Sequence, residues 1–198
     1  MKLSMHALAL GAWFLILSGC TYKRLPALQT YMLHMPNTIQ VSRSKYREKV
    51  VKVAYPYTFG STLSDKIMYT YDTSKRSSYK HSRWAYDVTD MLYALWLEAL
   101  QKARLFKSVV PYSSFVHENL RLESTVYDIV HRIDHGDSQA ILSVGFLLID
   151  SDSGKLIKAK RFEYTIKTET VDAKGFVKAL DRAVTLLVRD LIVWIGQS

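Results

Sequence analysis

A short N-terminal segment decides which part of this chain is free to fold as a domain. Residues 1–6 carry one lysine, Lys2, and residues 7–17 form an unbroken apolar run. At a rise of about 1.5 Å per residue, this run is too short to cross a hydrocarbon core of about 30 Å comfortably. Two small residues then precede Cys20, the only cysteine of the chain. This pattern is typical of a bacterial lipoprotein signal peptide, and we expect residues 1–19 to be removed.

Cys20 is the predicted lipidation site. The processing enzymes require small side chains before the cleavage point and a thiol directly after it, and here Ser18 and Gly19 meet the first requirement. The sulfur would receive a diacylglyceryl group, and the new amine is commonly acylated with a fatty acid such as palmitate. At about 0.8 kcal/mol per buried methylene, two or three chains anchor a domain stably. The alternatives are an ordinary secretory signal or a buried cysteine in an N-terminal helix.

Composition limits what the rest of the chain can be. Without residues 1–19 it has 198 − 19 = 179 residues, which suits one domain with its own core. We expect residues 20–30 to form a lipidated tether and residues 31–198 to form the domain. The formal charge is +9. In the cytosol that charge would fit nucleic acid, but beyond the inner membrane it favours anionic lipid head groups or an acidic protein, so no nucleic-acid partner is expected.

Hydrophobic periodicity predicts a single α/β domain, in which two long α-helices pack on a mixed β-sheet. Apolar residues recur at helical spacing over residues 84–105 and, most clearly, over residues 173–195, where Asp172 is placed to cap the helix. Residues 120–133, 139–149 and 156–167 are three successive strand candidates. The turn sequence 150–155 predicts that residues 139–167 form an antiparallel hairpin. Residues 72–82 are polar and lack periodicity, which predicts an exposed loop.

We find no pattern that predicts catalysis or a cofactor. The sequence contains no nucleophile elbow, no glycine-rich phosphate loop and no H-E-x-x-H motif, so we expect a protein that is not an enzyme. His131 and His135 have the spacing of two zinc ligands on a helix, but they fall at a strand end that runs into a turn. We therefore predict no metal site and no cofactor.

Two basic runs are candidate contact segments. The first contains Arg43, Lys45, Arg47 and Lys49, and the second covers residues 75–83. Each is either a solvated loop or a contact with an anionic membrane surface, where a well-placed Lys or Arg contributes about 1 kcal/mol. Tyrosines are frequent in the same region, and tyrosine and arginine are favoured at interface hot spots. We name the first run as the candidate partner or membrane contact.

Taken together, the chain resembles the ABC-type transport auxiliary lipoprotein family. The matching features, in chain order, are Leu17-Ser18-Gly19-Cys20, Tyr31-Met32-Leu33, the V-V-K-V-A-Y-P of residues 50–56, Trp84-Ala85-Tyr86-Asp87, the strand at 120–129, Lys160-Arg161-Phe162 and the helix starting near Asp172. Tyr55-Pro56-Tyr57-Thr58 stands where the family usually has a proline and a tyrosine-leucine pair after its early strand.

The resemblance implies a non-catalytic periplasmic subunit of a lipid-handling ABC transport system. Its partners would be the permease and ATPase complex and a substrate-binding protein of the mammalian-cell-entry type, and homo-oligomerisation is left open. Because no aspartate follows Cys20, we expect the lipid anchor to lie in the periplasmic face of the outer membrane. The alternatives are a periplasmic or surface binding lipoprotein unrelated to ABC transport, and a small enzyme on a lipid tether.

Overall fold

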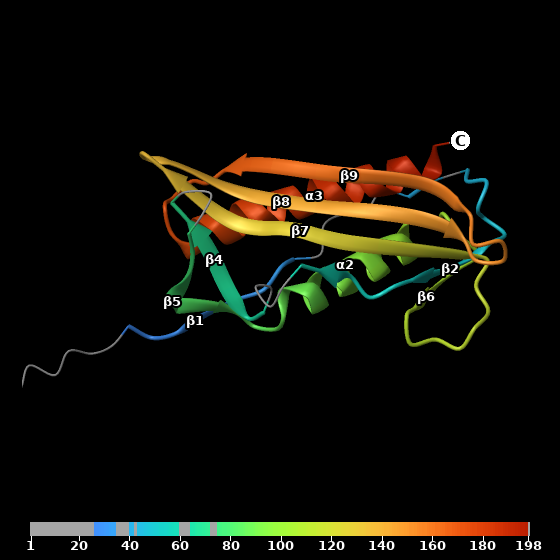
Figure 1. Ribbon diagram of the computed structural model, residues 1–198, viewed down its shortest axis with the longest axis horizontal. Coiled ribbons are helices and arrows are strands. Elements are labelled where there is room, and N and C mark those ends of the chain that lie inside the picture. Colours follow the sequence, from blue (N-terminus) through green and yellow to red (C-terminus); the bar gives the residue numbers. More distant parts are fainter. Residues whose placement is uncertain (1–25, 35–39, 42, 60–63, 72–74, 198) are drawn as a thin grey trace, which may run out of the picture.

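The computed structural model describes residues 26–34, 40–41, 43–59, 64–71 and 75–197. The predicted signal peptide and Cys20 lie outside this part of the chain. The described residues form one nine-stranded mixed sheet and two helices, α2 (Val88–Ala103) and α3 (Ala173–Gly196) (Figure 1). This confirms the predicted fold class.

Both helices pack on the same face of the sheet. On α2, the Trp96 ring lies 5.2 Å from that of Phe146, and on α3 the Trp194 ring lies 6.2 Å from that of Phe162. Phe146 and Phe162 are neighbours on adjacent strands, with ring centroids 6.1 Å apart. Among the described residues, no helix covers the opposite face, so that face is open to solvent or to a partner.

The sheet is organised around its longest strand, β7 (Leu120–Asp134). One edge of β7 pairs antiparallel with β8 (Asp137–Asp150) over its whole length. The other edge is shared by three short parallel strands: β2 (Val50–Val53) near its start, β3 (Tyr57–Thr58) at its middle and β4 (Lys66–Thr70) near its end. A single strand therefore joins both ends of the domain.

The predicted hairpin is confirmed. The strands β8 and β9 (Leu156–Lys167) pair antiparallel, from Gln139 opposite Lys167 to Ile149 opposite Leu156. A two-residue turn joins β7 to β8, and both its residues, His135 (φ 41°) and Gly136 (φ 91°), are left-handed. Such turns match the right-handed twist of the strands that they connect.

The C-terminal helix agrees with its prediction to within one residue. The Asp172 carboxylate accepts a hydrogen bond from the Gly175 N–H at 2.7 Å, which caps α3 as expected. At the other end, the Lys158 ammonium donates to the Trp194 carbonyl at 2.9 Å and also to the Gln197 carbonyl. A cation at this position donates to carbonyls that have no partner within the helix. Its positive charge also interacts favourably with the negative C-terminal end of the helix dipole.

The first helix begins later than predicted. We expected it over residues 84–105, but α2 runs from Val88 to Ala103, and the Asp87 carboxylate caps it by accepting from the Thr89 N–H at 2.8 Å. Trp84 belongs instead to the preceding strand and packs on Phe176 of α3, with ring centroids 6.3 Å apart. Its apolar side chain fitted the helical spacing, although it reaches the core from a strand.

The predicted loop at residues 72–82 is wrong from Arg76 onward. Residues 76–84 form the strand β5 (Arg76–Trp84), which pairs antiparallel with β4 and parallel with β1 (Gln29–Tyr31). Most of its side chains are exposed, and its sequence is correspondingly polar. It therefore lacks the alternation of apolar and polar residues that would predict a strand. Backbone hydrogen bonds to two neighbouring strands hold it in the sheet.

Different segments of the chain lie at the two ends of the molecule (Figure 1). At one end, here called the tether end, β1 and β5 lie beside the first described residues. At the opposite end, here called the far end, lie the C-terminus, β6 (Ser108–Pro111) and residues 43–49. α3 has 24 residues and spans about 36 Å between these ends.

Candidate functional site

The basic segment singled out from the sequence lies at the far end. Arg43, Lys45 and Lys49 are exposed, whereas the Arg47 guanidinium donates to the Val41 carbonyl at 3.2 Å and so helps to shape the segment. The Lys45 ammonium lies 5.2 Å from the ring centroid of Tyr46, a buried residue. These contacts hold the backbone in place and leave three cations facing outward. The other predicted site residue, Cys20, lies outside the described residues.

A group of exposed aromatic side chains forms the more extensive surface. We define the aromatic band as Tyr55, Tyr57, Phe59, Tyr93, Tyr112 and Tyr127. Five of these side chains, all except Tyr93, are between 41% and 61% exposed. Large apolar groups gathered on a surface indicate an interaction site more often than scattered ones do. The sequence indicates only that tyrosines are frequent in the region of the two basic runs, and not which rings meet.

The first half of the aromatic band is a mutual cluster of three tyrosines. Tyr55, Tyr93 of α2 and Tyr112 lie with their ring centroids 5.5 to 5.7 Å apart in tilted and edge-to-face arrangements. The Tyr55 hydroxyl donates to the Asp90 carboxylate at 2.6 Å. Partial burial and this hydrogen bond raise the pKa of Tyr55, so its hydroxyl remains a donor at neutral pH.

The second half depends on an irregularity in β7. The register between β7 and β8 shifts between Val126 and Asp128, so Tyr127 is the extra residue of a β-bulge. Bulges redirect side chains and often occur at functional positions. Here the Tyr127 ring stacks on Phe59, with centroids 5.7 Å apart, and Phe59 meets Tyr57 edge-on at 5.2 Å.

Gly145 allows Tyr127 to lie flat across the open face of the sheet. A Cβ atom at Gly145 would come within 2.9 Å of the Tyr127 ring, so a larger residue would push the ring away. The Arg161 guanidinium lies 4.1 Å from the Tyr127 ring centroid, and its Nε donates to the Ser143 hydroxyl at 2.9 Å. The result is a stack of two aromatic rings and one cation, Phe59–Tyr127–Arg161, held in a fixed geometry.

Two surface hollows adjoin the aromatic band. One, of about 310 Å³, lies on the open sheet face beside Tyr127, Leu147 and Arg161. The other, of about 470 Å³, lies between α2 and Met32-Leu33, and Asp90, the acceptor of the Tyr55 hydroxyl, lines it. Its lining residues are Met32, Leu33, Tyr86, Asp90, Met91, Ala94, Leu95 and Glu98. Aromatic anchors beside shallow apolar hollows are typical of protein-binding surfaces, in which rigid rings fill pockets on a partner.

The two histidines considered for zinc are not brought together. His131 is fully buried, whereas the His135 side chain is fully exposed at the β7–β8 turn. His131 instead joins a hydroxyl network: its Nδ1 lies 2.8 Å from the Tyr79 hydroxyl and its Nε2 lies 2.5 Å from that of Ser138. A neutral ring satisfies both contacts because a hydroxyl can donate or accept. Within the described ranges, no cluster of three potential metal ligands occurs.

Neither described helix is long and apolar enough to span a membrane. Both are amphipathic helices whose apolar sides form the core against the sheet.

Comparisons with known proteins identify relatives of this fold. A family model described as the ABC-type transport auxiliary lipoprotein component matches residues 31–192. No curated protein matches the chain. Among solved structures, protein XCC0632 from Xanthomonas campestris has a TM-score of 0.76 at 16% identity, over 85% of this chain and 95% of that one.

Two further structures show how far the similarity extends. An uncharacterized protein has a TM-score of 0.65 at 16% identity, over 85% of this chain and 99% of that one. Lipoprotein GNA1162 from Neisseria meningitidis is more distant, with a TM-score of 0.41 at 15% identity, over 71% of this chain and 97% of that one. At such identities the first two support the fold, and the family model carries the relationship.

Proposed function

The chain belongs to the ABC-type transport auxiliary lipoprotein family, and from this premise we propose that it is the non-catalytic, lipid-anchored periplasmic subunit of a lipid transport system. In this proposal its partners are an ABC permease and ATPase and a substrate-binding protein of the mammalian-cell-entry type. Its anchor lies in the periplasmic face of the outer membrane. The observation that carries the proposal is the family match, which extends over nearly the whole predicted domain.

The exposed surfaces support a docking role. The second half of the aromatic band supplies rigid rings beside the open sheet face, and the Phe59–Tyr127–Arg161 stack supplies a cation with a fixed position. Tyrosine and arginine are enriched among residues that dominate binding energy. We propose that the aromatic band contacts the transporter and that Arg43, Lys45 and Lys49 add an electrostatic contact at the far end. Arg47 has a shaping role in the same segment, because it is bonded to Val41.

We expect Cys20→Ser to abolish lipidation. Serine has no thiol to receive the diacylglyceryl group, so the precursor should remain uncut and unacylated, and should fractionate with the inner membrane or be released. Metabolic labelling with a fatty-acid analogue measures this directly, with the wild-type chain as the positive control. Continued labelling of the serine variant would contradict the predicted anchor.

Co-purification tests the transport role. A tagged full-length chain, extracted from its own membranes in mild detergent, should enrich an ABC permease, its ATPase and a mammalian-cell-entry-type protein. We expect Tyr57→Ser/Phe59→Ser/Tyr127→Ser to reduce this yield at least tenfold, because each truncated hot-spot residue costs about 2 kcal/mol of binding. Wild-type yield from this variant would show that the aromatic band is not the docking surface.

A charge variant separates the far-end cations from the aromatic band. We compare Arg43→Glu/Lys45→Glu/Lys49→Glu, which keeps Arg47, with the wild-type chain in the same co-purification. A loss that grows as the salt concentration falls would indicate an electrostatic contact with a partner. Unchanged yield at low salt would show that the segment is only solvated.

The second candidate function is a binding lipoprotein unrelated to ABC transport. The hollow of about 470 Å³ along α2 favours it, since its size suits a small apolar ligand. If co-purification enriches no transporter component from wild-type membranes, this second function becomes the better explanation of the exposed surfaces.

A further inference from the structure

We propose that the tether end of the domain carries a contact surface for anionic lipid head groups, formed by Lys66, Lys80, His81 and Tyr71. This surface, here called the tether-end patch, would hold the domain against the membrane in one orientation. The inference rests on the lipid anchor of the proposed function, but it concerns different residues from the transporter contact.

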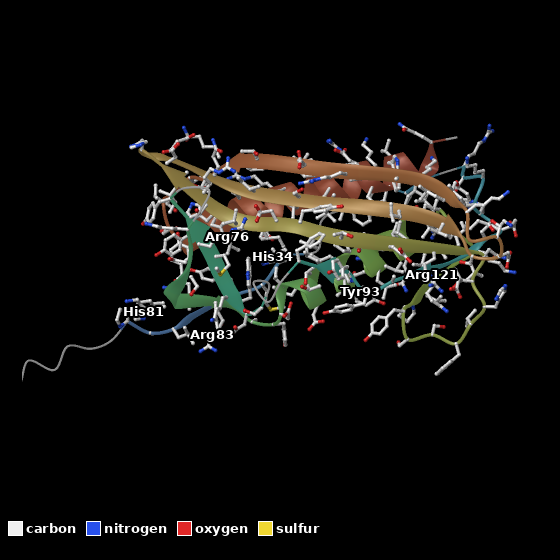
Figure 2. All side chains as sticks on the ribbon, in the orientation of Figure 1. His34, Arg76, His81, Arg83, Tyr93 and Arg121 are labelled. Carbon is white, nitrogen blue, oxygen red and sulfur yellow. The ribbon has the colours of Figure 1, made fainter. Side chains whose placement is uncertain are left out.

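The pairing of β1 with β5 places the tether-end patch beside the point where the chain leaves the domain. Gln29 lies opposite Ser82 in a parallel register, and Tyr31 lies opposite Trp84. The first described residues therefore lie next to the His81 side of β5, as Figure 2 shows at the same end of the molecule. From Cys20, eight further residues reach Leu28, and even when fully extended they span only about 26 to 29 Å. The membrane anchor and the tether-end patch are thus kept close together.

The charges at this end leave cations free for a membrane. Two arginines are already neutralised: the Arg76 guanidinium bonds both Asp128 oxygens, at 2.9 and 3.0 Å, and the Arg83 guanidinium lies 3.4 Å from the Asp65 carboxylate. Lys66 and Lys80 are exposed, and no carboxylate within the described ranges forms an ion pair with either ammonium group. These unpaired positive charges attract negative charge, so an anionic membrane surface is the complementary partner.

Aromatic groups at the same end fit the membrane interface. Tyr71 is 66% exposed and meets Tyr69 edge-on, with ring centroids 5.4 Å apart. These two rings, Tyr79 and Lys80 line a hollow of about 270 Å³. Tyrosine is enriched at the level of the lipid head groups, where its ring meets the apolar boundary and its hydroxyl stays hydrated. A cation beside tyrosines in a shallow hollow is suited to an anionic head group.

The far end cannot make the same contact while the tether-end patch is docked. Arg43, Lys45 and Lys49 lie at the opposite end of the molecule, and α3, which runs between the two ends, is itself about 36 Å long. Electrostatic attraction to a membrane decays within a Debye length of about 8 Å at physiological ionic strength. The fold therefore separates the two basic runs of the sequence into a membrane-facing group and an outward-facing group.

The test measures orientation on vesicles. Ser77→Cys adds an exposed thiol on β5, and this thiol carries a spin label. The labelled, lipidated full-length chain is reconstituted in two kinds of vesicle, one of phosphatidylcholine alone and one of phosphatidylcholine mixed with phosphatidylglycerol. We expect phosphatidylglycerol to protect this label from a water-soluble relaxation agent. A label at Ser113→Cys, on the exposed loop after β6, should stay accessible in both vesicles. A lipidated Cys20 has no free thiol, so spin labelling of Cys20 would reveal that the lipid anchor is missing. That result would contradict the proposed function, and it is measured separately from the orientation of the domain.

Charge variants decide whether the tether-end patch is responsible. Each well-placed cation contributes a factor of about five, so Lys66→Glu/Lys80→Glu should lower the ratio of docked to undocked domain by about 25-fold or more. Lys66→Arg/Lys80→Arg should keep the protection. Lys45→Glu/Lys49→Glu changes the net charge equally and should leave it intact. Equal protection in the two kinds of vesicle, or equal loss in both glutamate variants, would overturn the proposal.

Discussion

Replacing Glu118 with glutamine is expected to destabilise the domain by about 3 kcal/mol, because it leaves two cations facing each other without their shared anion. Lys52 of β2 and Arg121 of β7 are direct cross-strand neighbours. The Glu118 carboxylate, only 7% exposed, lies 2.7 Å from the Lys52 ammonium and 2.9 Å from the Arg121 guanidinium. Like charges directly opposite each other weaken a pair of strands.

Urea unfolding measures this effect, and a second ion pair supplies the control. Glu98 and Lys102 form an exposed pair on α2 at 2.5 Å, so Glu98→Gln should cost no more than about 0.5 kcal/mol. Adding Lys52→Met to Glu118→Gln should restore part of the loss, since one unpaired cation is then removed. A loss below about 1 kcal/mol in Glu118→Gln would show that solvent compensates both cations.

Acidification from pH 6.5 to pH 4 is expected to remove up to about 3 kcal/mol of stability through His131. Burial lowers the pKa of this imidazole from 6.5 to about 4, although the nearby Asp172 carboxylate partly opposes the shift. In this window the unfolded chain binds a proton that the folded chain excludes. The free energy of unfolding therefore falls as the pH falls, and the contribution is fully lost near pH 4.

His131→Gln tests this assignment. Glutamine can still exchange hydrogen bonds with Tyr79 and Ser138 but cannot take up a proton, so the variant should start less stable at pH 7 and lose less stability on acidification. His117→Gln, at an exposed histidine beside Asp152, is the control for replacing a histidine by glutamine elsewhere in the domain. Parallel pH profiles of His131→Gln and the wild-type chain, from urea midpoints between pH 7 and 4, would contradict the assignment.

The two effects occupy different pH ranges and can be separated. Hydrogen bonds from Lys52 and Arg121 lower the pKa of Glu118 from 4.5 to about 2. Its contribution is present above pH 4.5 and is lost as the pH falls towards 2. Acid unfolding of the wild-type domain should thus show a His131 phase first and a Glu118 phase below it.

Some surfaces could be anticipated and others could not. The sequence predicts a basic contact segment, and Arg43, Lys45 and Lys49 are exposed in the structure, but the contact itself stays a prediction. No sequence pattern indicates that Tyr93 and Tyr112 meet Tyr55, because the three residues come from separate segments. Nor did it indicate that Tyr127 occupies a bulge, which depends on the register with β8.

The amino-acid sequence by itself determined the elements whose hydrophobic residues recur at a clear strand or helix period. The hairpin within residues 139–167 and the helix capped by Asp172 carry their signals in consecutive residues, since alternation, turn residues and a helical stripe depend on near neighbours. Tertiary structure decided the rest. The strand β5 is polar and exists through backbone bonds to β1 and β4, and three parallel strands share one edge of β7. Parallel pairing joins residues far apart in the chain and leaves no local pattern, so only the folded sheet places the first described residues, the aromatic band and the two basic groups relative to one another.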